Sequence, residues 1–239
     1  LKPLGNLYTL IGDYSNAENS IKQYYFVASQ EKNESQKQAA VLNLSNVYQN
    51  TGRIDQAIEL LEKTIQKEKL TNAQKGLLYN NLGSNYFLNT RATKMKSYAF
   101  ENAEKAFLKA VLLLEREPSQ HEALTNSYRN LCKLNLERKN KQMALHYFEK
   151  AKHTFEKIPN PNPRKKAQFY FDEANMLFKQ REITASSLAI ERVFKTLIPA
   201  YSSAKTVLPN QSALYAETIL LDVLDLQAEL FLAQSQPKK

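Results

Sequence analysis

Apolar residues recur at helical spacing on both sides of a short polar break in the stretch from residue 43 to residue 64, NLSNVYQNTGRIDQAIELLEKT. The pattern predicts two amphipathic helices joined by a tight turn at Thr51-Gly52-Arg53, because glycine readily adopts a positive φ. Neither helix can bury its apolar stripe alone. The stretch therefore indicates one unit of a repeat array, in which each copy is buried against its neighbours.

The same landmarks occur in an earlier copy at constant spacing. Three of them reappear forty positions later in the chain: Tyr8 and Tyr48, Gly12 and Gly52, Ala17 and Ala57. Chance does not readily produce three equal offsets, so we interpret the two stretches as copies of one helix pair.

A third and a fourth copy follow with changes in spacing. In the third, Gly83 and Tyr86 reproduce the first-helix landmarks, but about eight extra residues precede the second-helix landmark Ala103. The insertion must lengthen the turn or extend the helices beside it. In the fourth copy, Cys132 and Ala144 hold the landmark positions.

The pattern weakens toward the C-terminal end. A fifth copy begins near Ala174, and the helix predicted from about 183 to 197 carries Leu188, Val193 and Leu197 slightly out of register. Before it, the three prolines of residues 157–166, KIPNPNPRKK, cannot continue a helix. We interpret this segment as a long loop between repeats, and a domain hinge is the alternative.

These copies define the domain organisation that we expect. Four repeats are predicted over residues 1–158, a degenerate fifth over 159–206, and a terminal helix over 207–239 that is the first half of a truncated repeat. A break at Leu208-Pro209-Asn210 precedes that helix. Because the first and last copies lack part of the pattern, we expect the chain to be a piece of a longer protein.

The motif L-G-x-x-Y followed by A-x-x-x-F resembles the tetratricopeptide repeat over roughly residues 1–200. This resemblance implies an all-α, right-handed α-solenoid of antiparallel helix pairs. The small landmarks let two helices approach closely, while Leu, Tyr and Phe fill the groove beside them. No Trp opens any copy and the period is nearer 40 than 34. The helices should therefore be longer than in the standard repeat, as in the long-repeat subclass that resembles kinesin light chain.

A narrower resemblance involves the last fifty residues. The segment VFKTLIPAY, followed by LYAETILLDVLDLQAELFLAQ, resembles the repeat region that precedes a caspase-like CHAT domain in bacterial proteins. The resemblance implies that a peptidase-like effector domain lies beyond Lys239 and that its catalytic residues are not in this chain.

Composition narrows the possible partners. The net charge is +9, but the basic residues are spread among 24 acidic ones and no nucleic-acid motif accompanies them, so we expect no nucleic-acid binding. No run approaches the roughly 18 apolar residues that a membrane-spanning helix needs. We expect a soluble, cytoplasmic chain without a membrane contact.

Few residues could carry catalysis. Cys132 stands where other copies have Ser45 or Gly83, which predicts a buried packing thiol. His146 and His153 share a helix face, but no third ligand lies at a suitable spacing. The chain also lacks phosphate-binding glycine loops and hydrolase motifs. We therefore expect no enzymatic activity, no metal and no cofactor.

The first helices of the copies carry polar residues beside the landmarks, and these predict a peptide-binding groove. Amide side chains can pair with the backbone of an extended peptide, and Arg129 and Lys133 lie one turn apart, suitably placed for a carboxylate. The predicted site consists of Asn6, Asn46, Asn50, Asn80, Ser84, Arg129 and Lys133.

Other asparagines have a structural interpretation. Asn43, Asn81 and Asn130 recur at one equivalent position in three copies, which favours hydrogen bonds between repeats over ligand contacts. Lys2, Asn6 and Asn43 also resemble part of the carboxylate clamp of tetratricopeptide co-chaperones. That pattern fails in the third copy, where Leu77 and Asn81 replace the expected basic residues, so we do not predict a clamp.

The function that we expect is protein or peptide binding by a non-catalytic scaffold, in a sensor or regulatory role within a larger protein. The alternative is a structural scaffold that associates with itself. Its interface would be the apolar face of the helix from Ala213 to Ala233, on which we place Leu220.

Overall fold

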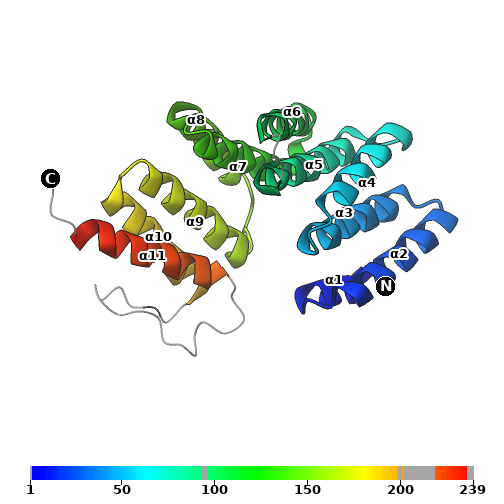
Figure 1. Ribbon diagram of the computed structural model, residues 1–239, viewed down its shortest axis with the longest axis horizontal. Helices are drawn as coiled ribbons and strands as arrows, with labels where there is room; N and C mark the ends of the chain where they lie inside the picture. The colour runs from blue at the N-terminus through cyan, green and yellow to red at the C-terminus, as the bar shows by residue number, and fades with distance from the viewer. Residues whose placement is uncertain (1, 93–95, 199–200, 202–218, 236–239) are drawn as a thin grey trace. The chain divides into compact units, whose positions relative to one another are not determined.

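The computed structural model describes residues 2–92, 96–198, 201 and 219–235, and these residues form eleven α-helices and one 3₁₀ turn (Figure 1). The chain divides into two compact units: unit 1 comprises Leu1–Leu134 and Lys150–Phe155, and unit 2 comprises Asn135–Glu149 and Glu156–Lys239. The first six helices are α1 (Lys2–Leu10), α2 (Tyr14–Gln30), α3 (Glu34–Asn50), α4 (Ile54–Lys67), α5 (Asn72–Ala92) and α6 (Lys96–Leu114). The 3₁₀ turn Pro118–Gln120 leads to α7 (His121–Glu137), α8 (Lys141–Phe155), α9 (Pro163–Lys179), α10 (Ile183–Leu197) and α11 (Ile219–Ser235).

Unit 1 has the stacking of a repeat array. Helices α1 and α2, α3 and α4, and α5 and α6 pack as pairs, and each later first helix also contacts the second helix of the preceding pair. Successive first helices touch as well, α1 with α3 and α3 with α5. Each amphipathic helix is therefore buried by its sequence neighbours, as the pattern predicts.

The small landmarks lie in the contacts between paired helices. A Cβ on Gly83 would lie 2.6 Å from the Phe107 ring, and one on Gly5 would lie 2.7 Å from Cγ1 of Ile21. Such distances leave no room for a side chain, so only glycine allows this approach. The landmark alanines are fully buried, as expected for small residues at close helix contacts: Ala17, Ala57, Ala103 and Ala144.

The insertion in the third copy extends the helices beside it. Helices α5 and α6 have 21 and 19 residues, against 17 and 14 in α3 and α4. At the other end of this pair, away from the insertion, Gly76 and Leu114 meet, since a Cβ on Gly76 would lie 2.6 Å from Cγ of Leu114.

The turns inside the second and fifth helix pairs share one backbone geometry. Gly52 has φ +74°, and the next residue, Arg53, donates its N–H to the Tyr48 carbonyl at 2.8 Å. This bond closes the end of α3 in the manner of a Schellman motif. The α9/α10 turn has the same bond, but there Arg181 adopts φ +68° in place of glycine.

In unit 2, helix α11 packs against both α9 and α10 (Figure 1). Leu220 is only 1% exposed and belongs to the core of this unit. The prediction that Leu220 lies on an open apolar face is therefore wrong, because the exposed side of α11 carries its neighbour Leu221 instead. The break at 208–210 and residues 213–218 of the predicted helix lie outside the described residues.

The fifth pair is more regular than the sequence pattern indicates. The buried residues of α10 are Ser186, Ala189, Ile190, Val193 and Phe194, which follow normal helical spacing. Leu188 gave the impression of a shifted register because it lies on the outer face, 57% exposed.

The proline-rich segment is shorter than predicted. Helix α9 begins at Pro163, inside the predicted loop, because proline is well tolerated in the first turn of a helix. The Asn162 side chain caps this end by accepting the N–H of Arg164 at 2.9 Å. In the described ranges, no helix combines the length and the apolar character that crossing a membrane requires.

Candidate functional site

The seven residues of the predicted site all lie in unit 1, on the first helices of four successive pairs. Those on α1 and α3 are exposed, and those on α5 and α7 are half-buried. We call this set the amide face: Asn6, Asn46, Asn50, Asn80, Ser84, Arg129 and Lys133.

A hydrogen bond between repeats orients Asn6. The Asn43 side chain donates its Nδ2–H to Oδ1 of Asn6 at 2.9 Å, which links α3 to α1. No described residue accepts a hydrogen bond from Nδ2 of Asn6. Since the oxygen and nitrogen lie on opposite sides of the amide carbon, the bond to Asn43 turns the Asn6 donor group away from the helix contact.

Asn80 is oriented in the same way by two donors on α7. Its Oδ1 accepts from Oγ of Ser127 and from Nδ2 of Asn130, both at 3.1 Å. Asn130 also donates to Oγ of Ser84 at 3.4 Å, while that hydroxyl donates to the Asn80 carbonyl at 3.1 Å. The Ser84 hydroxyl is thus engaged inside the protein, whereas no described residue accepts from Nδ2 of Asn80.

The structural interpretation of the recurring asparagines is confirmed at two of three positions. Asn43 and Asn130 link repeats, but Asn81 donates to the Leu77 carbonyl of its own helix at 3.0 Å. The corresponding link is made one turn later by Asn85, which is fully buried and donates to Oγ of Ser45 at 3.3 Å. Sequence reasoning missed Asn85, although it lies forty positions after Ser45, the spacing of the repeat.

The basic end of the amide face lies on α7. Arg129 donates from a terminal guanidinium nitrogen to Oδ1 of Asn126 at 2.8 Å, which holds its side chain along the helix. Lys133 follows one turn later and is half-buried. Two cations at this spacing can share one carboxylate.

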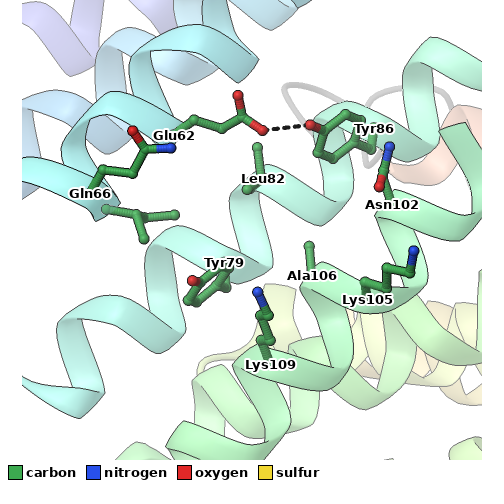
Figure 2. Close-up of a pocket in the computed structure, with 10 residues that line it drawn as sticks. Glu62, Gln66, Tyr79, Leu82, Tyr86, Asn102, Lys105, Ala106 and Lys109 are labelled. Carbon is green, nitrogen blue, oxygen red and sulfur yellow. Dashed lines mark hydrogen bonds between the residues drawn. The ribbon is translucent and has the colours of Figure 1, made fainter.

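A pocket of about 230 Å³ lies elsewhere on unit 1, between α4, α5 and α6 (Figure 2). Leu82 and Ala106 provide apolar wall, and Tyr79 and Tyr86 provide aromatic wall. Polar groups complete the lining: Glu62 and Gln66 from α4, and Asn102, Lys105 and Lys109 from α6.

Two interactions fix the aromatic walls. The Tyr86 hydroxyl donates to Oε1 of Glu62 at 2.6 Å. Burial raises the pKa of Tyr86, and the Glu62 carboxylate raises it further, so this hydroxyl remains a donor at neutral pH. Nζ of Lys109 lies 5.2 Å from the centre of the Tyr79 ring, within cation–π range.

Sequence reasoning did not find this pocket. The sequence feature that could have indicated it is the pair Lys105 and Lys109, which lie one turn apart on α6 with the small residue Ala106 between them. Both lysines are exposed in the structure. The lining comes from three helices, so no contiguous motif marks it.

Cys132 and His146 are two of the residues considered for catalysis or metal binding. Cys132 is buried, as predicted for a packing thiol. Within the ranges that the structure describes, no three His, Cys, Asp or Glu side chains gather in a metal-binding arrangement. The His146 ring packs edge-on against Tyr147, with 5.3 Å between ring centres.

Neither a family model nor a curated protein sequence matches the chain. Solved structures match it in fold. BtubC (BKLC) from P. vanneervenii is 20% identical, with a TM-score of 0.63 over 87% of this chain and 85% of that chain. A thermophilic TPR protein from Thermus thermophilus is 11% identical, with a TM-score of 0.65 over 98% and 97% of the two chains. PilF from Pseudomonas aeruginosa is 18% identical, with a TM-score of 0.56 over 97% of this chain and 87% of that chain. These similarities establish the fold and confirm the predicted class, an all-α solenoid of antiparallel helix pairs.

Proposed function

We propose that this chain, which has the fold of tetratricopeptide-repeat proteins, is a non-catalytic interaction module that binds an extended segment of a partner protein along the amide face. The observation that carries the proposal is the fixed orientation of Asn6 and Asn80. Each has its oxygen held by an asparagine of the next pair, so that its NH₂ group is available to a ligand. Donors fixed before binding lose little conformational entropy when a peptide carbonyl reaches them.

The charge of the amide face favours an acidic residue at one end of the segment. Arg129 and Lys133 lie on α7, beyond the neutral amides of α1, α3 and α5. Charge-assisted hydrogen bonds are stronger than neutral ones. A peptide with an Asp or Glu near one end therefore fits this face better than a neutral peptide.

Replacing Asn6 and Asn80 by aspartate tests the amide donors. Aspartate keeps an oxygen for Asn43 and Asn130 but replaces the NH₂ group by a second acceptor. Peptides would first be selected from a random 12-residue phage library on the unmodified chain. We expect Asn6→Asp with Asn80→Asp to weaken their binding about tenfold or more, since two donors are lost and two negative charges are added.

Asn72→Asp is the matched control, because Asn72 is exposed on α5 and outside the amide face. It adds one negative charge, half of what the double variant adds, and should leave the affinity within about twofold. Equal affinity of the selected peptides for the double variant and the control would contradict the proposal.

A second variant tests the basic end. Arg129→Ala with Lys133→Ala should weaken binding of selected acidic peptides several-fold and leave neutral peptides unaffected. Fluorescence anisotropy at low and high salt measures both, because the ionic contribution decreases with screening. Unchanged affinity for acidic peptides would remove these two residues from the site.

The resemblance to repeat regions that precede CHAT domains supports a narrower proposal. In it, partner binding controls a caspase-like effector domain of the same polypeptide, and this chain is the regulatory part. The coding sequence after Lys239 is the test. A Cys-His peptidase-like domain there supports the proposal, and a kinase or DNA-binding domain contradicts it.

Self-association through α11 is the second candidate function. Leu221 and Phe231 are 66% and 49% exposed on this helix, which leaves apolar surface open to solvent. Leu221→Asp should convert a dimer to a monomer in sedimentation experiments, whereas Leu220→Asp would unfold the core of unit 2. A chain that is monomeric at all concentrations, with or without Leu221→Asp, would contradict this function.

A further inference from the structure

The pocket between α4, α5 and α6 opens on a different side of α5 from the amide face. An α-helix advances about 100° per residue, so Tyr79, Leu82 and Tyr86 lie roughly 140° around α5 from Asn80 and Ser84. A ligand in the pocket and a segment on the amide face would therefore not compete for the same contacts. Nothing in the proposed function uses this pocket.

The volume suits one side chain or a chain end. Pockets for drug-sized ligands measure about 300–1,000 Å³, and this one is smaller, at about 230 Å³. Pockets of this kind commonly receive a single anchor residue of a partner protein. Leu82 and Ala106 would contact the apolar stem of such an anchor.

The ionic groups of the pocket favour one negative charge. Lys105 and Lys109 have no carboxylate partner among the described residues, and both are exposed at the α6 wall. Glu62, on the α4 wall, is the one acidic side chain of the lining, and its Oε1 already accepts from Tyr86. The lining charge is therefore about +1, which suits a carboxylate better than a phosphate dianion.

An unpaired amide adds a third donor to the α6 wall, beside the two lysines. Nδ2 of Asn102 is buried and has no hydrogen-bond partner. Such a group destabilises the fold while it remains unpaired. A modest rotation of the side chain toward the pocket would let a ligand oxygen accept this hydrogen bond.

We propose that this pocket binds one carboxylate of a partner protein, either an Asp or Glu side chain or a C-terminal carboxylate. The carboxylate lies between Lys105 and Lys109, and its carbon chain contacts Leu82 and Ala106. The pocket thus gives unit 1 a second recognition site, for an acidic anchor.

NMR titration with small probes tests the proposal on the whole chain. The probes are acetyl-glutamate amide for the side chain, acetyl-leucine for the chain end, and acetyl-glutamine amide as the neutral match. We expect millimolar binding of at least one charged probe, with shifts centred on residues 79–86 and 102–109, and at least tenfold weaker binding of the neutral probe. The stronger of the two charged probes identifies the source of the carboxylate.

Variants locate the binding in the pocket. Lys105→Gln with Lys109→Gln should weaken the charged probe about tenfold, since each partly solvated ion pair contributes up to about 1 kcal/mol. Ala106→Leu should block binding by filling the pocket, and its fold is checked by the dispersion of the amide spectrum. Lys67→Gln removes one exposed charge of α4 outside the pocket and should have no effect.

Three results would overturn the proposal: equal binding of the charged and neutral probes, shifts outside the pocket, or binding of inorganic phosphate in preference to both carboxylates. The Asn6→Asp with Asn80→Asp variant should bind the charged probe normally. Failure of the amide face and failure of the pocket are therefore distinguishable.

Discussion

The second and fifth helix pairs carry the same two small residues in exchanged places. In the second pair Ser45 lies on α3 and Ala57 on α4, and in the fifth Ala174 lies on α9 and Ser186 on α10. Each couple is twelve positions apart, and all four residues are fully buried. Each pair therefore has one fully buried small side chain on either helix, and the alanine can lie on the first helix or the second.

The turns of these two pairs also share a geometry but differ in the residue that adopts it. Gly52 and Arg181 hold equivalent left-handed positions, with φ +74° and +68°. A non-glycine residue in this conformation is strained by roughly 1–2 kcal/mol. The fifth pair nevertheless closes with the same hydrogen bond, from Glu182 N–H to the Leu177 carbonyl at 2.9 Å. Packing of the two helices therefore overrides the local preference at residue 181.

Gly83→Val tests whether small residues permit the close contact between paired helices. It is expected to have the largest effect on stability. Its side chain would enter the space occupied by the Phe107 ring, 2.6 Å from the new Cβ. We expect a loss of about 2–3 kcal/mol in the free energy of unfolding, measured by urea denaturation. Hydrogen exchange should localise the loss to α5 and α6.

Phe107→Ala on the same background tests the cause. If the ring and the new valine compete for one space, the two losses should be clearly less than additive. Additive losses would mean that Gly83 acts through its backbone and not through the space it leaves.

Repeat spacing made the helix pairs predictable. Sequence reasoning overlooked a second spacing, the twelve positions between the small residues of one pair. Gly5 and Ala17, Cys132 and Ala144, and the two couples of the second and fifth pairs are all separated by twelve positions. A search for alanine alone missed Ser186, and with it the regular register of α10. The apolar pattern also could not show whether Leu220 or Leu221 faces the core, because two adjacent leucines on a helix satisfy either orientation.

The candidate site was harder to predict because its geometry depends on distant partners. First-helix positions were enough to select the seven residues of the amide face. The orientation of Asn6 and Asn80 depends on partners 37 and 50 positions away, and the pocket on three helices. Such contacts leave no local signature in the sequence.

Ser186→Ala should have the next largest effect on stability, and it tests whether the two exchanged couples are equivalent. The Ser186 hydroxyl donates to the Ala174 carbonyl at 2.8 Å in a buried contact. Its loss should cost about 1 kcal/mol, seen as faster hydrogen exchange in α9 and α10. The reciprocal change Ala57→Ser should be nearly neutral, because the equivalent Ser45 carbonyl can accept the new hydroxyl. A large loss on Ala57→Ser would show that the couples are not equivalent.

Substitutions in the two turns should have smaller effects on stability, and of opposite sign. Arg181→Gly should stabilise unit 2 by about 0.5 kcal/mol, since it relieves the left-handed strain at a modest cost in chain entropy. Gly52→Ala should destabilise unit 1 by about 1 kcal/mol or less for the converse reason. Thermal unfolding of the two variants measures both shifts. Shifts of the same sign would show that the two turns are not under equivalent constraint.

The smallest effect concerns the residue after the turn, which is Arg53 in the second pair and Glu182 in the fifth. Arg53 donates to Glu18 of the first pair at 2.6 Å. That hydrogen bond, with a weaker one from Lys22, holds the pKa of Glu18 below its ordinary value. A lowered carboxyl pKa stabilises the fold above the unfolded-state value, about 4.3 for glutamate, and this contribution is lost as the pH falls through the lowered folded value.

The contribution should be less than about 1 kcal/mol, because both side chains are partly solvated. Hydrogen exchange as the pH is lowered below about 4.3 should therefore show slightly greater destabilisation of α2 and α4 in the unmodified chain than in Glu18→Gln. The same comparison for α9 and α10 should show no difference, because the fifth pair carries an acid where the second carries Arg53. An equal effect of Glu18→Gln on both pairs would mean that acid acts through the global charge of the chain and not through this bridge.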